Sequence, residues 1–254
     1  MPTETPQLRA SGRSRRGAAR LKQTVKRHLP WLGSPYRYLR RLHWNLVTKP
    51  KWQRLGMAVF TEHYRENSWG DDESVSGRGS RVDSTVAIRA AMPALIEDLK
   101  IQTLLDIPCG DFNWMRLLDL PVRYIGADVV QELVAENQRR FGSARRFFLK
   151  LDLTADPLPE ADLILCRDCF IHLSFDDISR ALANIKRSKA RFLLVTNHHD
   201  LDQNEDIVTG EWRRVNLQRP PFSFPKPLMQ ISEQRSGKEV TYDKSLALWE
   251  ISAL

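Results

Sequence analysis

Long apolar stretches are missing from this chain of 254 residues. No run approaches the roughly 18 apolar residues of a membrane-spanning helix. The first residues also lack the apolar stretch of a secretory signal. The three cysteines, Cys109, Cys166 and Cys169, are too few for a disulfide framework, which favours a reducing compartment. We therefore expect a soluble, cytoplasmic protein with one large domain and an extension.

Positive charge is concentrated at one end. Residues 1–60 carry 14 Lys or Arg and one acid, whereas the rest carry 25 basic and 30 acidic residues. We expect 1–60 to be a basic, partly disordered N-terminal arm with amphipathic helices, and 61–254 to form the main domain. The arm suits an anionic membrane surface, which would place the protein peripherally at the inner membrane face. It equally suits a nucleic-acid backbone, or a solvated tail with a helix packed on the body.

Strand-like and helix-like segments alternate from Thr103 onward. The expected strands are 103–109, 123–130, 146–153, 161–169 and 190–198, and the expected helices are 83–99, 113–120, 131–141 and 175–188. Two further strands, 228–234 and 245–251, can pair as a closing hairpin. This order predicts an α/β, Rossmann-like doubly wound fold, with a mostly parallel seven-stranded sheet and a C-terminal antiparallel strand pair.

Two segments fall outside this alternation. Residues 69–80, WGDDESVSGRGS, read as a loop that is either a linker or a wrap around a ligand. Residues 200–227 are irregular and rich in proline where a helix is expected, which favours a lid over the site or a rigid wrap without a substrate role. Within that lid, Asn204 and Trp212 are the expected substrate contacts, because amides bond hydroxyls and rings stack on sugars.

Acidic residues stand where four successive strands end, at the edge of a doubly wound sheet where ligands bind. They are Asp106, Asp128, Asp152 and Asp168. Asp128, 22 residues after Asp106, is placed to accept ribose hydroxyls. The first turn, PCGD, lacks the G-x-G-x-x-G of dinucleotide sites, and Asp111 would repel a pyrophosphate. A ligand with ribose, adenine, an ammonium group and no phosphate fits better, and S-adenosylmethionine is such a ligand.

Four segments resemble, in order and spacing, the first four motifs of class I S-adenosylmethionine-dependent methyltransferases. They are LLDIPCGDFNWM (104–115), YIGADVV (124–130), FFLKLDL (147–153) and DLILCRDCFIHLS (162–174). The chain is most similar to a bacterial group with DxPCGDFNWM and RDxxxHLS motifs. Pro108 departs from the glycine usual in the superfamily and stiffens the turn.

This resemblance implies roles for the residues at the strand ends. The first turn would hold the methionine part of the cofactor, Asp128 the ribose and Asp152 the adenine amine. The full expected cofactor set is Asp106, Pro108, Cys109, Gly110, Asp111, Trp114, Asp128, Asp152 and Arg167.

Catalytic candidates follow the fourth and fifth strands. His172 is four residues after Asp168, which is one turn if a helix begins there, and it would serve as general base; a capping or core histidine is the alternative. Asp168, Asn197 and His198 could instead meet a divalent ion, although we expect no metal site. The DIPC segment also resembles RNA cytosine-C5 methyltransferases, in which Cys109 would be the nucleophile.

The sequence thus predicts a methyltransferase that methylates a hydroxyl of a glycan or polar small molecule. One alternative is an RNA methyltransferase that uses the basic arm. Another is a non-enzymatic membrane-surface adaptor on a degenerate methyltransferase fold. A nicotinamide-dependent oxidoreductase is disfavoured by Asp111 and the missing glycines.

Overall fold

The structure is a computed structural model that describes residues 39–233 and 243–254. The predicted disorder of residues 1–20 lies outside this range. The chain forms two compact units, 1–51 and 52–254. In the described part of the first unit the chain is helical, including a π-helical stretch at Trp44–Thr48, and the side chains of Leu39, Leu42 and Leu46 are exposed. The second unit holds the sheet and also includes residues 52–60.

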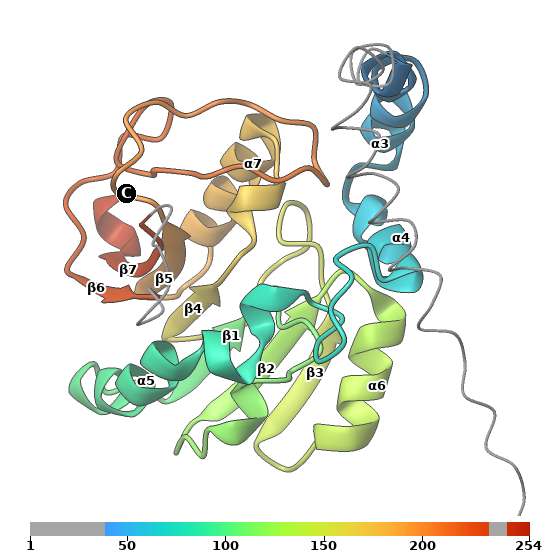
Figure 1. The fold of residues 1–254 in the computed structure, drawn as a ribbon. Helices are drawn as coiled ribbons and strands as arrows, with labels where there is room; N and C mark the ends of the chain where they lie inside the picture. Colours follow the sequence, from blue (N-terminus) through green and yellow to red (C-terminus); the bar gives the residue numbers. More distant parts are fainter. Residues whose placement is uncertain (1–38, 234–242) are drawn as a thin grey trace, which may run out of the picture. The chain divides into compact units, whose positions relative to one another are not determined.

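A seven-stranded sheet forms the centre of the second unit (Figure 1). The strands are β1 (Thr103–Asp106), β2 (Arg123–Asp128), β3 (Arg146–Lys150), β4 (Leu163–Cys166), β5 (Phe192–Asn197), β6 (Met229–Ser232) and β7 (Ser245–Glu250). Their order is β3-β2-β1-β4-β5-β7-β6, with β1 to β5 parallel and β7 antiparallel to both β5 and β6. The predicted fold class, including the antiparallel C-terminal pair, is confirmed.

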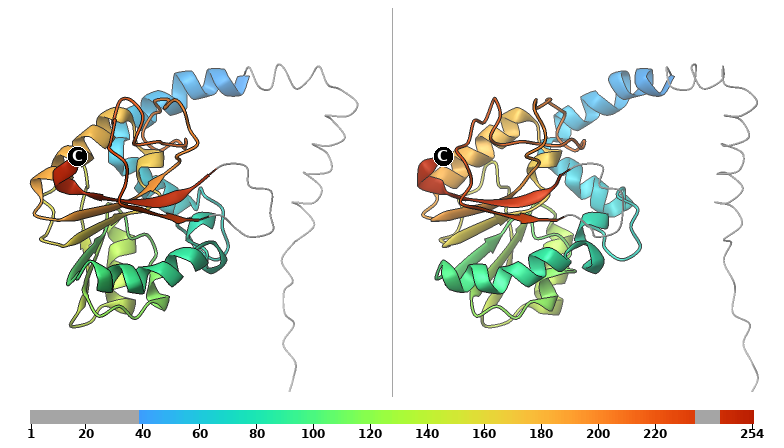
Figure 2. Two further views of the ribbon diagram at one scale, coloured as in Figure 1. Left: turned by 90° about the vertical axis from the view of Figure 1, so that its left-hand side faces the viewer. Right: turned by 60° about the vertical axis from the view of Figure 1, so that its left-hand side comes forward.

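Alternate residues of each strand face two different helical layers, as the two-residue period of a strand requires. Leu105, for example, belongs to a core with α7 (Phe175–Arg187), whereas its neighbour Leu104 belongs to a core with α5 (Val86–Asp98). Helix α6 (Gln131–Phe141) lies on the α5 side. Figure 2 shows the sheet edge-on between these layers. Both faces of the central strands are therefore buried, which explains their continuous apolar sequences.

Helix α7 shows how the sequence fixes an element in place. Ser174 caps its N-terminus by accepting a hydrogen bond from the Asp177 amide, acids occupy the first turn and Lys186 and Arg187 the last. This arrangement satisfies a free amide and complements the helix dipole. No helix in the described residues is both long and apolar enough to span a membrane.

Two expectations about local structure were wrong, and a third, the helix over 83–99, is confirmed except at its start. The helix expected over 113–120 is a single 3₁₀ turn at Met115–Leu117, preceded by Gly110 and Phe112 in left-handed conformation. The helix expected over 83–99 begins at Val86, after two 3₁₀ turns, Arg78–Ser80 and Val82–Ser84. No helix begins directly after β4, where Asp168 has a φ of 53° and only a 3₁₀ turn, Phe170–His172, follows.

Candidate functional site

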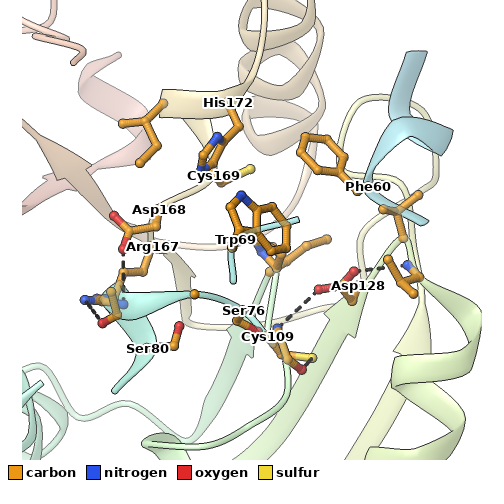
Figure 3. Close-up of a pocket in the computed structure, with 18 of the residues that line it drawn as sticks. Phe60, Trp69, Ser76, Ser80, Cys109, Asp128, Arg167, Asp168, Cys169 and His172 are labelled. Atoms are coloured by element: carbon orange, nitrogen blue, oxygen red, sulfur yellow. Dashed lines mark hydrogen bonds and ion pairs between the residues drawn. The ribbon is translucent and has the colours of Figure 1, made fainter. Parts of the chain in front are cut away.

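A cavity of about 380 Å³ opens at the carboxyl ends of β1, β2 and β4. Figure 3 shows residues from several distant segments converging on it. The turn after β1, the ends of β2 and β4, and the loop 69–80 form one part, while residues 57–64 and the segment around Trp212 form another. Its volume is within the range of small-molecule sites. The position matches the ligand edge of a doubly wound sheet.

The turn after β1 presents Asp106, Pro108, Cys109 and Gly110 to the cavity. Asp106 is buried and accepts a hydrogen bond of 2.7 Å from the Tyr124 hydroxyl. Burial raises the pKa of Asp106 to about 7, against the opposing effects of the Tyr124 bond and the Arg167 charge. Asp106 therefore titrates near neutral pH.

Asp128 lies at the end of β2 and also lines the cavity. Its carboxylate accepts hydrogen bonds from the amides of Gly110 (3.2 Å) and Val130 (3.0 Å), which tie the β1 and β2 turns together. Burial raises the pKa of Asp128 to about 6, although these amide bonds oppose the shift. Asp128 is thus mostly ionised at pH 7 and retains lone pairs that can accept further hydrogen bonds.

An apolar wall continues from Asp128 along one side of the cavity. It consists of Val129, Val130, Leu133, Leu151 and Leu153. Asp152 lies between two of these residues but is not part of the lining, because its carboxylate accepts hydrogen bonds from the amide and hydroxyl of Thr154 (2.8 and 2.6 Å). The wall offers a flat heterocycle a dry surface.

Asp111 is likewise absent from the lining, because it binds the loop 69–80. Its carboxylate accepts hydrogen bonds from the Ser74 hydroxyl (3.0 Å), the Val75 amide (3.1 Å) and the Ser76 hydroxyl (3.3 Å). The Asp111 amide in turn donates to the Ser76 hydroxyl at 2.9 Å. This loop is therefore fastened over the β1 turn, and its residues 75–80 line the cavity.

Four charged side chains meet where β4 ends. Arg167 pairs with Glu233 (2.6 Å) and Asp168 (3.3 Å), and Lys244 pairs with Asp168 (2.7 Å) and Glu233 (3.1 Å). Burial alone would raise the pKa of Asp168, but the charges of Lys244 and Arg167 hold it well below its usual range. Asp168 therefore stays ionised.

His172 points into the cavity beside Trp69 and Cys169 (Figure 3). Its Nδ1 donates a hydrogen bond of 2.8 Å to the carbonyl oxygen of Glu211, which fixes the tautomer and leaves Nε2 as the acceptor of a neutral ring. Burial lowers the pKa of His172 below its ordinary 6.5, against the opposing effects of this carbonyl and of Asp168. His172 is thus neutral at pH 7, as a general base must be.

Arg213 holds the 3₁₀ turn that carries His172. Its guanidinium donates to the carbonyl oxygens of Phe170, of Leu173 at 2.7 Å and of Glu205 at 3.2 Å. Burial lowers the pKa of Arg213 to about 10. One side chain therefore locks the turn after β4 to the irregular segment 200–227.

Aromatic side chains surround His172. The ring centroids of Trp69 and Phe60 lie 5.9 and 6.5 Å from that of His172, and Met57, Tyr64 and Trp212 complete this side. Helix α4 (Val59–Glu66) brings Phe60 and Tyr64 here, since it packs on Gly210, where a Cβ would lie 3.0 Å from Val59. This part of the cavity suits a ring with at least one apolar face.

Several expected site residues meet in this cavity, and three do not line it. Those that line it are Asp106, Pro108, Cys109, Gly110, Trp114, Asp128, Arg167, Asp168, His172 and Trp212. Asn204 lies elsewhere, like Asp111 and Asp152, because its buried amide donates to the carbonyls of Asn216 and Pro220. The sequence analysis did not predict residues 57–64 or Lys244, because their contribution depends on tertiary contacts that have no sequence motif.

Other chemistries that the sequence raised have little support. In the described residues no group of three His, Cys, Asp or Glu side chains is placed to hold a metal ion. Burial, together with the charges of Asp128 and Asp106, raises the pKa of Cys109 well above its usual value. A thiolate nucleophile at Cys109 is therefore disfavoured.

Comparison with known proteins identifies the fold. No protein-family model and no curated sequence match the chain. A SAM-dependent methyltransferase from Leishmania major matches with a TM-score of 0.55 and 13% identity, over 74% of this chain and 82% of that one. The 1,6-didemethyltoxoflavin-N1-methyltransferase of Burkholderia thailandensis matches with a TM-score of 0.52 and 16% identity, over 80% and 90%. Human N-acetylserotonin methyltransferase matches with a TM-score of 0.48 and 17% identity, over 74% of this chain but only 58% of that one. The chain has the class I methyltransferase fold that its motifs predicted.

Proposed function

We propose that this chain is an S-adenosylmethionine-dependent methyltransferase that acts on a hydroxyl oxygen of a glycan or polar small molecule. The proposal rests on one observation, the division of the cavity into two halves. One half has Asp128 beside an apolar wall and suits a nucleoside, and the other is centred on the neutral His172. The position of both halves at the ligand edge of a class I fold supports this assignment.

The residues present fit S-adenosylmethionine. Asp128 has lone pairs for the ribose hydroxyls, the wall from Val129 to Leu153 suits adenine, and Asp106 lies in the turn expected to face the ammonium group. Of the three Lys and Arg side chains in the described lining, Arg167 and Lys244 are paired with carboxylates. Only the exposed Arg78 of these is then left for a phosphate, which disfavours a pyrophosphate. When bound, this cofactor would supply an electrophilic methyl group on a positively charged sulfur.

His172 would accept the acceptor's proton. Nε2 carries the free lone pair because Nδ1–H is held by Glu211. Nε2 would take the hydroxyl proton while the oxygen received the methyl group that the bound cofactor supplies, and the products would be a methyl ether, S-adenosylhomocysteine and a protonated imidazole. Asp168 carries a negative charge near the ring and would stabilise the imidazolium. The rings of Phe60, Trp69 and Trp212 would orient the acceptor and exclude water.

The aromatic half of the cavity supports an acceptor that contains a ring. Exposed and half-buried rings at Trp212 and Trp69 suit stacking on a sugar or another small ring, and His172 supplies the polar contact. The related Burkholderia enzyme is named for a small acceptor and is described with that acceptor and S-adenosylhomocysteine bound. This supports a small-molecule acceptor over a macromolecule.

The proposal can be tested in two stages. Isothermal titration calorimetry with S-adenosylhomocysteine and with NAD should show binding of the first and none of the second. Extracts incubated with protein and methyl-labelled cofactor should then give a labelled acceptor that mass spectrometry identifies. The His172→Gln variant should bind S-adenosylhomocysteine equally well and produce no label. Absence of S-adenosylhomocysteine binding by the folded protein would reject the function.

A further inference from the structure

The loop 69–80 is a fixed part of the cavity wall, held at two points. In its middle, Asp111 binds Ser74, Val75 and Ser76. Near its end, the Gly79 carbonyl accepts a hydrogen bond of 2.8 Å from Arg167. These two anchors follow β1 and β4, which are neighbours in the sheet.

Close contacts crowd three glycines, Gly77 and Gly79 in this loop and Gly110 in the β1 turn. A Cβ at Gly79 would lie 2.7 Å from the Asp168 carboxylate, and one at Gly110 would lie 2.3 Å from the Ser76 hydroxyl. Gly77, with a φ of 86°, packs against Trp69 at 3.1 Å. The loop therefore packs directly against Asp168, after β4, and against the β1 turn. These contacts define the conformation of the loop without a bound ligand.

Arg78 begins the 3₁₀ turn Arg78–Ser80 at the end of this loop. It lines the cavity, and its side chain is exposed. Arg167 and Lys244, the other cations of the lining, are already paired with Asp168 and Glu233. Among the described residues no carboxylate pairs with Arg78. In the described lining, Arg78 is thus the cation left for an anionic group of a ligand.

The proposed cofactor carries one such group. Its amino acid tail has an ammonium, which suits Asp106, and a carboxylate, for which the β1 turn itself provides no positively charged partner. We propose that the loop 74–80 belongs to the cofactor site and that Arg78 binds the carboxylate of the cofactor's amino acid tail. This inference rests on the proposed function. A guanidinium can bind a carboxylate through two parallel hydrogen bonds, which a lysine cannot reproduce.

Ligands that differ in the tail provide the test. S-Adenosylhomocysteine has the carboxylate, decarboxylated S-adenosylhomocysteine lacks only this group, and 5′-methylthioadenosine lacks the whole amino acid. Isothermal titration calorimetry should compare the wild type with Arg78→Gln and Arg78→Lys. Arg145→Gln is the matched control, because Arg145 is also exposed but does not line the cavity.

Arg78→Gln should weaken S-adenosylhomocysteine binding about tenfold, the scale of a lost charge-assisted hydrogen bond at an exposed site. It should leave the affinities for the decarboxylated compound and for 5′-methylthioadenosine within about twofold of wild type. Arg78→Lys should restore part of the loss, and Arg145→Gln should match the wild type.

Two results would overturn the inference while the function stands. One is equal S-adenosylhomocysteine affinity in Arg78→Gln and wild type, with or without a raised KM for the acceptor. The other is an equal loss of affinity for all three ligands, which would mean that Arg78 stabilises the loop and does not bind the carboxylate. If the wild type bound none of the ligands, the proposed function itself would fail.

Discussion

Nδ1 of His172 lies 2.8 Å from the carbonyl oxygen of Glu211, 39 residues away in the chain. This bond sets which ring nitrogen faces the cavity, and it joins the turn after β4 to the irregular segment that replaces the next helix. The proposed general base and the group that orients it therefore come from different parts of the sequence.

We expect His172→Gln to abolish or strongly reduce turnover without changing cofactor affinity. Since the pKa of His172 lies below 6.5, the neutral base predominates above that pH. With the cofactor saturating at every pH, wild-type turnover should therefore fall as the pH drops below 6.5. Steady-state kinetics across pH 5–8 would check this, and turnover close to wild type in the variant at pH 7.5 would remove His172 as the base.

Asp128→Asn should weaken S-adenosylhomocysteine binding by about 1–3 kcal/mol, the scale of lost charged hydrogen bonds. Because the pKa of Asp128 is about 6, protonation below that pH should weaken wild-type binding as well. Calorimetry at pH 5, 6 and 7.5 should show a pH-dependent affinity for the wild type and a flat one for the variant. Equal affinities at pH 7.5 would reject the ribose assignment.

Asp106→Asn tests how much ionisation of the buried Asp106 carboxyl lowers the free energy of unfolding. Its pKa of about 7 in the folded protein, above the 3.8 of an unperturbed Asp, means that the folded state binds a proton that the unfolded state has released. Wild-type stability should therefore decrease as pH rises through this window, by about 2–3 kcal/mol between pH 5 and pH 8, relative to the variant. Urea unfolding at both pH values measures this difference. The exposed Asp119→Asn should parallel the wild type.

Ser76→Ala separates two roles of Asp111. If Asp111 acts by fastening the loop, both Ser76→Ala and Asp111→Asn should weaken cofactor binding and speed hydrogen exchange of the Val75 amide, which donates to Asp111. If Asp111 contacts the ammonium directly, only Asp111→Asn should weaken binding. Asp72→Asn, an exposed acid in the same loop, is the control.

Arg213→Lys should reduce turnover while cofactor affinity is retained. A lysine cannot reach the carbonyls of Phe170 and Leu173 together, and a buried carbonyl left without a partner costs about 1–3 kcal/mol. We expect the free energy of unfolding to fall by this amount and the acid limb of kcat/KM to shift as the imidazole loses its fixed position. Arg214→Lys, at the next position, should show neither effect.

Local sequence patterns sufficed to predict the strands and the acids that follow them. Buried apolar runs define β1, β4 and β5, and their ends lie at one edge of the sheet whatever the tertiary detail. The sequence pattern could not predict which groups each strand-end acid contacts, because its surroundings depend on the tertiary structure. Asp128 faces the cavity, whereas Asp152 binds Thr154 within its own turn.

Other parts of the site depend on contacts that no periodicity encodes. Lys244 reaches Asp168 across 76 residues, and Phe60 lies near His172 across more than 100. The left-handed conformation of Asp168 also breaks the helical spacing on which its expected proximity to His172 rested. Both residues nevertheless line the cavity, brought there by the end of β4 and the 3₁₀ turn after it.

The contact of helix α4 with Gly210 bears on how shortened versions of this protein should be designed. The strongly basic stretch ends at residue 60, so a shortened protein could start at residue 61 and keep every strand. It would lack Met57 and Phe60, which line the cavity, and Val59, which packs against Gly210. Such a fragment should fold and bind nucleoside yet fail to methylate. For enzymology, the start site should therefore lie before Trp52, whose ring also touches the Gly210 position.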